Sequence, residues 1–343
     1  MKLVSYLANN GEHLGLFVEN TIYNLPENAG LIGKQLPDSM AAFLNGGTDA
    51  MKIAHEVNTG IINKSIKGIA ANVNSDALLA PVPHPTSCRD GYAFRQHVEA
   101  ARRNRKVPMI TEFDQNPIFY FTNHNAVQGP GDIVCMPDHF QKLDFELEVS
   151  IVIGKKGRNV KAADADSYIA GYMIMNDMSA RTLQMEEMAL NLGPAKGKDF
   201  STVIGPWLVT PDELEQYKVP AKPGHVGNAY DLSMTCKVNG KVVSQGNMKE
   251  MDWTFAEIIE RCAYGVDILP GDVIGSGTVG TGCFLELNGT GLLNDPNYKV
   301  QWLQPNDVVE MDVKGLGHLS NTIKKDNSDF SILALKKFSE TTA

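Results

Sequence analysis

The chain has 343 residues, of which 43% are hydrophobic and 21% are charged, which is typical of a soluble globular protein with more than one core. Its formal net charge of −9 argues against nucleic acid or an anionic membrane as a main partner. Five scattered cysteines without a Cys-x-x-Cys pair indicate a reducing compartment and argue against a zinc site built from thiolates. We find neither a long apolar run nor an N-terminal signal pattern, so we expect a cytoplasmic protein.

Residues 1–80 predict a small β-rich domain. Short apolar runs at 3–7, 14–18 and 21–25 alternate with turn residues, the pattern of a β-meander, and residues 40–72 then have helical spacing. Three prolines at positions 81, 83 and 85 favour an extended linker. We therefore expect a domain boundary there, with residues 81–343 forming the larger domain.

The larger domain begins with a segment that is rich in helix formers, residues 90–101. Asp90 and His97 are seven positions apart, so both could face one side of a helix. A basic stretch follows, made of Arg102, Arg103, Arg105 and Lys106. It is either a solvated helix end, which the helix dipole favours, or a patch that steers an anionic substrate toward an acidic protein.

Residues 144–154 predict a β-strand with two carboxylates on one face. Glu146 and Glu148 alternate with apolar residues, so they point the same way at a spacing of roughly 6–7 Å, which one cation can bridge. An amphipathic strand with a solvated outer face is the alternative explanation of this segment.

A second apolar strand, residues 171–175, leads to Asp177, and Ser179 is a suitable N-cap for the helix that follows. Arg181 and Gln184 share one face of that helix. Lys198 on its own is typical of a solvated surface lysine. Beyond residue 207 we expect mostly strands, among them 232–243, 272–274, 284–287 and 308–313. These elements predict a strand-dominated α+β fold, and no dinucleotide or P-loop motif argues for a doubly wound sheet.

The segments described so far contain a set of four carboxylates, Asp90, Glu146, Glu148 and Asp177. Hard oxygen donors suit Mg²⁺, Mn²⁺ or Ca²⁺ rather than zinc. Spacing alone leaves open whether these separated segments converge.

Taken in order, the motifs closely resemble the fumarylacetoacetate hydrolase family. They are Asp90-Gly91-Tyr92, Asp144-Phe145-Glu146-Leu147-Glu148, Asn176-Asp177-Met178-Ser179-Ala180-Arg181, Gly197-Lys198-Asp199-Phe200, Leu269-Pro270-Gly271-Asp272 and Gly315-Leu316-Gly317-His318. The resemblance spans roughly residues 82–325 and implies a mixed β-sandwich roll for the larger domain.

The resemblance also implies roles for single residues. The metal ligands would be Asp90, Glu146, Glu148 and Asp177, with Mg²⁺ as the expected ion and Lys198 and Thr202 close to it. His97 would activate water, and Glu286 would orient His97. The oxyanion donors would be Arg181, Gln184 and Lys198. The substrate contacts would be Tyr92, Thr278, Arg181 and Gln184.

The implied reaction is cleavage of a carbon–carbon bond in a β-diketo acid, such as an acylpyruvate or a compound like fumarylacetoacetate. Decarboxylases, isomerases and hydratases of the family share the metal site, and a catalytically silent scaffold is an alternative of another class. His97 and Glu286 together favour hydrolysis. Two tyrosines that contact substrate in fumarylacetoacetase fall at Asn123 and Met188, so we expect a different diketo or oxo acid. The resemblance further implies a homodimer and a role in the catabolism of aromatic compounds.

Overall fold

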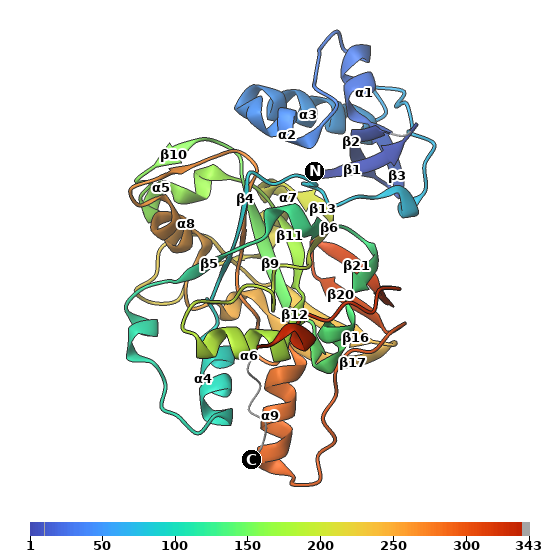
Figure 1. Cartoon of the computed structure of the whole chain (residues 1–343). Coiled ribbons are helices and arrows are strands. Elements are labelled where there is room, and N and C mark those ends of the chain that lie inside the picture. Colours follow the sequence, from blue (N-terminus) through green and yellow to red (C-terminus); the bar gives the residue numbers. More distant parts are fainter. Residues whose placement is uncertain (10, 338–343) are drawn as a thin grey trace.

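The computed structural model describes residues 1–9 and 11–337, and its N-terminal part contains the predicted meander (Figure 1). The meander strands are β1 (Lys2–Ala8), β2 (Gly11–Val18) and β3 (Thr21–Asn24), and β1 and β3 both pair with β2 in antiparallel fashion. Three helices follow, namely α1 (Leu25–Leu31), α2 (Met40–Asn45) and α3 (Gly47–Ile62). The helical prediction for residues 40–72 is therefore correct to residue 62 only.

A mixed sheet of ten strands forms the centre of the molecule, in the order β3-β2-β1-β13-β11-β9-β19-β4-β5, with β6 beside β13. Its further strands are β4 (Ser87–Gly91), β5 (Phe119–Thr122), β6 (Val127–Gln128), β9 (Leu147–Ile153), β11 (Ile169–Asp177), β13 (Thr202–Val209) and β19 (Asp272–Gly275). Because β1 pairs with β13, this sheet crosses the expected boundary at residues 80 and 81. The division into two domains stays a prediction.

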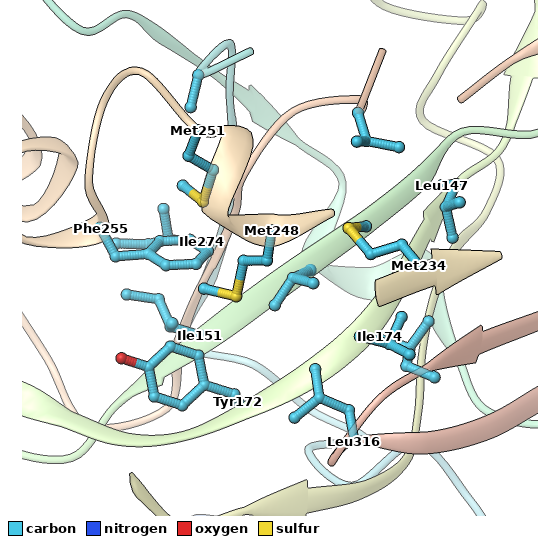
Figure 2. Packing of buried hydrophobic residues seen from close by; sticks show 14 of the residues in the cluster. Leu147, Ile151, Tyr172, Ile174, Met234, Met248, Met251, Phe255, Ile274 and Leu316 are labelled. Atoms are coloured by element: carbon cyan, nitrogen blue, oxygen red, sulfur yellow. The ribbon is translucent and has the colours of Figure 1, made fainter. Parts of the chain in front are cut away.

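A second sheet of five strands packs against the first. It has the order β17-β16-β20-β21-β7. Its strands are β7 (Gly131–Cys135), β16 (Ser233–Val238), β17 (Lys241–Asn247), β20 (Val308–Val313) and β21 (Gly317–Lys325). Figure 2 shows the core between the sheets, where Ile151 and Ile174 lie in one cluster with Met234 and Leu316. The predicted strand-dominated α+β fold is thereby confirmed.

The remaining elements are short strands and helices around these sheets. The strands are β8 (Leu143–Asp144), β10 (Gly157–Arg158), β12 (Ser179–Ala180), β14 (Lys218–Val219), β15 (Ala229–Tyr230) and β18 (Asp267–Ile268). The helices are α4 (Arg95–Asn104), α5 (Ala162–Ala165), α6 (Arg181–Ala189), α7 (Pro211–Leu214), α8 (Phe255–Ala263) and α9 (Phe284–Asn294). In the described part of the chain, no helix combines the length and apolarity that crossing a membrane requires.

Four local predictions are wrong. Asp90 lies on β4, because its segment pairs with β19 and β5, and the helix begins only at Arg95. Residues 232–243 are not one strand, because Asn239 and Gly240 have positive φ and turn the chain into a hairpin. Residues 284–287 form the first turn of α9. Ser179 does not cap α6, which begins two residues later, and its hydroxyl donates instead to the Asp177 carbonyl oxygen.

Candidate metal and catalytic site

The four carboxylates predicted to share a cation do converge. One oxygen from each of Asp90, Glu146, Glu148 and Asp177 lies within 4.8 Å of the others, and all four residues are buried. Asp90, Glu148 and Asp177 stand on β4, β9 and β11, while Glu146 lies just before β9 rather than within the predicted strand. Asn176 holds this break in the strand through its Oδ1, which accepts from the Glu146 amide at 3.0 Å.

Two glycines between β9 and β4 make room for this cluster. A Cβ atom at Gly275 on β19 would lie 2.4 Å from Asp90 Oδ1, so any side chain there would displace the carboxylate. Gly277 has a φ of +78°, and its amide donates to Asp90 Oδ1 at 3.0 Å and to Glu148 Oε2 at 3.1 Å. The backbone between these strands therefore orients two of the four carboxylates.

Two buried cations contact the cluster on its other side. Lys198 Nζ donates to Asp177 Oδ2 at 2.8 Å and also to Glu146 Oε2, so Lys198 is not the surface lysine that its local sequence suggests. The Arg181 guanidinium lies 2.8 Å from both Glu146 Oε1 and Asp144 Oδ2. Arg181 also donates to Gln184 Oε1 at 3.0 Å.

These contacts give the carboxylates of the cluster different electrostatic environments. Burial opposes ionisation of Glu146, but Lys198 and Arg181 outweigh it and lower the pKa of Glu146 to about 2. Burial and the nearby Asp177 raise the pKa of Asp90 to about 7. Burial and the adjacent Asp90 raise the pKa of Glu148 well above its usual range. The Asp90–Glu148 side therefore lacks positive charge.

The residues present fit a divalent cation. Asp177 Oδ1 is buried and has no hydrogen-bond partner among the residues that the structure describes. An unpaired buried carboxylate oxygen is costly, and a hard cation beside it and beside the Asp90–Glu148 pair would offset both deficits.

A histidine–glutamate pair lies next to the cluster. His97 in the first turn of α4 and Glu286 in the first turn of α9 form a 2.6 Å contact between Nδ1 and Oε2, and both are buried. The two helices lie side by side (Figure 1). His97 and Glu146 also group with Cys283, with one potential ligand atom of each within 4.8 Å of the others. The predicted pairing of His97 with Glu286 is thus present, close to the carboxylates.

Asp144 connects the pair with the cluster, a role that the sequence did not suggest. It accepts from the backbone amides of Phe284 and Leu285 at 2.8 and 2.9 Å, which anchors the start of α9 and hence Glu286. The same carboxylate holds Arg181, which in turn holds Glu146. Asp144 lies in the motif that suggested the metal site, but only the fold shows its partners.

Tyr120 is a second residue that the sequence did not single out. Its hydroxyl donates to Asp177 Oδ2 at 2.5 Å, and burial raises the pKa of Tyr120 well above its usual range, so that the phenol stays a donor. Tyr120 stands on β5, and nothing in the local sequence distinguishes it from the neighbouring aromatic residues.

The other predicted residues also lie near the site. Thr278 Oγ1 donates to Glu148 Oε1 at 3.2 Å, and Thr202 is buried as the cross-strand partner of Asp177. The Tyr92 ring lies edge-on to His97 with 5.9 Å between centroids, and burial raises the pKa of Tyr92 to about 12.

The two positions where the sequence departs from fumarylacetoacetase have different environments. Asn123 donates to the Asp199 carbonyl oxygen at 3.0 Å, whereas Met188 is exposed on α6.

The basic stretch forms the C-terminal end of α4 and the residues after it. Arg102 and Arg105 donate to backbone carbonyls of Pro108 and Ala101, and Arg103 donates to Thr290. None of them forms an ion pair with another described residue. Burial raises the pKa of Tyr92, and the charge of Arg105 partly opposes that rise. The steering role of the basic stretch stays a prediction.

Comparisons with known proteins agree with this geometry. The family model described as "Fumarylacetoacetate (FAA) hydrolase C-terminal" matches residues 86–324. The human protein "Oxaloacetate tautomerase FAHD2A, mitochondrial" is 30% identical over 332 residues, covering 94% of this chain and 91% of its own. "Fumarylacetoacetate hydrolase domain-containing protein 2 homolog" of Dictyostelium discoideum is 29% identical over 330 residues, covering 94% of this chain and 97% of its own.

Solved structures with the same fold have lower identity. Fumarylacetoacetate hydrolase from Exiguobacterium antarcticum has a TM-score of 0.65 at 22% identity, covering 95% of this chain and 100% of its own. Maleylpyruvate hydrolase from Sphingobium sp. SYK-6 has a TM-score of 0.66 at 19% identity, with the same two coverages. At these identities the likeness concerns the fold alone.

Proposed function

Because the chain belongs to the fumarylacetoacetate hydrolase family, we propose that it is a divalent-cation-dependent enzyme that transfers a proton at the carbon beside a carbonyl group. The proposed reaction is enol–keto tautomerisation of a small anionic oxo acid of the oxaloacetate type. The observation that carries this proposal is the buried His97–Glu286 pair beside four converging carboxylates. The names of the relatives that match almost the whole chain support the choice of reaction.

The cation would be held by Asp90, Glu146, Glu148 and Asp177. An all-oxygen set suits Mg²⁺ first, with Mn²⁺ or Ca²⁺ as alternatives. When bound, the ion would act as a Lewis acid that withdraws charge from the oxygen atoms of the substrate.

His97 and Glu286 would handle the proton. Tautomerisation removes the proton from the enol oxygen and places a proton on the carbon next to the one that bears this oxygen, and no bond of the carbon skeleton breaks. Since Glu286 occupies His97 Nδ1, the other ring nitrogen is the one that can accept the enol proton and return it to carbon. Thr281 fixes the glutamate, because its amide donates to the second oxygen of Glu286 at 2.9 Å.

The polar residues around the pair would bind and orient the substrate. Arg181 donates to Asp144, Glu146 and Gln184, so its role would be to hold Glu146 in place. Because Gln184 accepts from Arg181 through Oε1, its amide N–H groups remain as donors to a substrate oxygen. Lys198 would stabilise negative charge beside Glu146 and Asp177, and Tyr92 and Thr278 would line the substrate position.

Hydrolysis of a carbon–carbon bond in a β-diketo acid is the second candidate, and the same pair favours it. His97 would then take a proton from water, which adds to a carbonyl carbon, and the departing carbon atom would be protonated as the bond breaks. Decarboxylation or isomerisation of a small oxo acid would use the same cation site without a water nucleophile, whereas hydration would add water across a carbon–carbon double bond.

A two-substrate assay separates these reactions. Purified protein is given enol-oxaloacetate, followed by loss of enol absorbance, and separately a panel of acylpyruvates, followed by loss of diketone absorbance. Each is run after EDTA treatment and again with Mg²⁺, Mn²⁺ or Ca²⁺ restored. We expect cation-dependent acceleration of ketonisation. Turnover of acylpyruvates alone would favour hydrolysis, and no cation-dependent turnover of either class would contradict the proposed function.

Three broader expectations belong to the same proposal: a homodimer, a cytoplasmic location and a place in the catabolism of aromatic compounds. Light scattering of the purified protein tests the first. The matching relatives include proteins whose names place them in mitochondria, so fractionation of the native cell must decide the second.

A further inference from the structure

We propose that Tyr120 is a positioning residue for the cation site, whose hydroxyl holds the Asp177 carboxylate so that one of its oxygens is reserved for the cation. This inference rests on the proposed function, because it assumes that the four carboxylates bind a divalent cation. The hydrogen bond of the Tyr120 hydroxyl goes to Asp177, so its effect on the cation would pass through that carboxylate.

The position of Tyr120 follows from the curvature of the main sheet. Tyr120 stands on the edge strand β5, directly opposite Asp90 of β4 in the antiparallel ladder. Three strands, β4, β19 and β9, separate β5 from β11, the strand that ends at Asp177. The Tyr120 hydroxyl nevertheless lies 2.5 Å from Asp177 Oδ2, so the face that carries the carboxylates is concave and Tyr120 closes it from the edge.

The two oxygens of Asp177 are used unequally. Oδ2 accepts from the Tyr120 hydroxyl and from Lys198 Nζ at 2.8 Å, whereas Oδ1 is buried without a partner in the described chain. The terminal torsion of an aspartate is broad, so a single donor would leave the carboxylate free to rotate. Two donors on Oδ2 restrain that torsion, and Oδ1 keeps its lone pairs for another partner. The unpaired oxygen is then the one left for the ion.

The hydroxyl, and not the ring, carries this role. Phe119 and Phe121 flank Tyr120 on β5, so the strand accommodates phenylalanine readily. Replacing Tyr120 by phenylalanine would keep the ring and leave Lys198 as the sole donor to Oδ2. Asp177 would then have to be ordered when the cation binds, which weakens binding. Residues that orient metal ligands typically contribute about 10- to 100-fold to metal affinity.

Tyr120→Phe tests the inference through cation affinity, with Tyr172→Phe as the matched control. Tyr172 stands on the same sheet, is more deeply buried than the half-buried Tyr120, and packs in the apolar core against Tyr230 and against Phe255, which Figure 2 shows. Mn²⁺ binding to the EDTA-treated full-length proteins is measured by the loss of the free-ion EPR signal. We expect the Kd of Tyr120→Phe to rise about 10- to 100-fold and that of Tyr172→Phe to stay within about twofold of wild type.

The possible outcomes separate this inference from the proposed function. A wild-type protein that binds no Mn²⁺ would overturn the cation site itself and the inference with it. A wild-type protein that binds Mn²⁺, together with a Tyr120→Phe variant of the same Kd, would overturn the inference alone. If Tyr120→Phe does not fold, the inference is tested instead with 3-fluorotyrosine incorporated at position 120. Its ¹⁹F resonance should shift with one equivalent of Mg²⁺, and an unmoved resonance would overturn the inference.

Discussion

Glu286→Gln is the change that isolates the proton-transferring pair. Glutamine keeps the size of Glu286 but removes the negative charge that faces His97 Nδ1 across 2.6 Å. Both side chains are almost inaccessible, with relative exposures of 9% and 4%, so water cannot replace the lost carboxylate. The side-chain amide of the glutamine can also donate to His97 Nδ1. This would favour the tautomer that carries its proton on Nε2, the nitrogen that should accept the enol proton.

The expected loss follows from these contacts. A positioned general base contributes about 10²–10⁴-fold, and holding a catalytic histidine in the wrong tautomer costs a loss near the upper end of that range. At 1.36 kcal/mol for each tenfold change, the barrier should rise by about 3–5.5 kcal/mol. Mn²⁺ affinity should stay at the wild-type value, because Glu286 is not among the four converging carboxylates.

The assay is kcat for ketonisation at saturating Mg²⁺, with Mn²⁺ binding measured in parallel. His97→Ala should cause a loss of about 10²–10⁴-fold, and the double variant should lose little more, because the two residues act as a unit. The matched control is Glu257→Gln, which alters the His225–Glu257 contact of 3.0 Å away from the carboxylate cluster. It should leave kcat unchanged. Wild-type kcat in Glu286→Gln would refute the role of the pair.

Three further predictions concern charge. Charge reversal by Arg105→Glu should raise KM for an anionic oxo acid at low salt. The effect should be smaller at about 0.5 M salt, where the Debye length falls to a few ångströms. An unchanged KM at low ionic strength would mean that the basic stretch is only a solvated helix end. Burial and Asp177 raise the pKa of Asp90 from 3.8 to about 7, so the folded, cation-free protein binds this proton more tightly than the unfolded chain. Its free energy of unfolding should therefore decrease as the pH rises from about 4 to about 7, and saturating Mg²⁺ should abolish the decrease; urea titrations that show no cation effect would contradict this. Asp144→Asn removes one of the two buried negative charges that face Arg181 and should reduce the free energy of unfolding by about 3–5 kcal/mol, together with kcat. If neither quantity falls, Asp144 does not have its connecting role.

The sequence predicted best those elements whose signals are local. The meander strands, β19 and β20 follow from alternation or short apolar runs between turn residues. The first turn of α9 was mistaken for a strand because a run of four residues suits either structure. Two glycines follow it, at positions 289 and 291, so this helix depends on the distant carboxylate of Asp144 at its start. Asp90 was misplaced because β4 is defined by its neighbours β19 and β5 rather than by its own residues.

In the candidate site, too, the sequence predicted local relations better than long-range contacts. The phase of a strand related Glu146 to Glu148, but only the resemblance to a known family joined His97 to Glu286 across 189 positions. Tyr120 and Asp144 were missed because they act through long-range contacts, Tyr120 with Asp177 and Asp144 with Arg181 and the start of α9. A lone tyrosine in an aromatic strand and an aspartate before a glutamate pair have no local pattern that would announce such a contact.

The central claim is that four carboxylates hold one divalent cation beside the His97–Glu286 pair. Anomalous scattering from crystals grown with Mn²⁺ tests it most directly. We predict a single strong peak among Asp90, Glu146, Glu148 and Asp177, with oxygen distances of roughly 2.0–2.6 Å. A peak elsewhere, or none at this cluster at saturating Mn²⁺, would contradict the account.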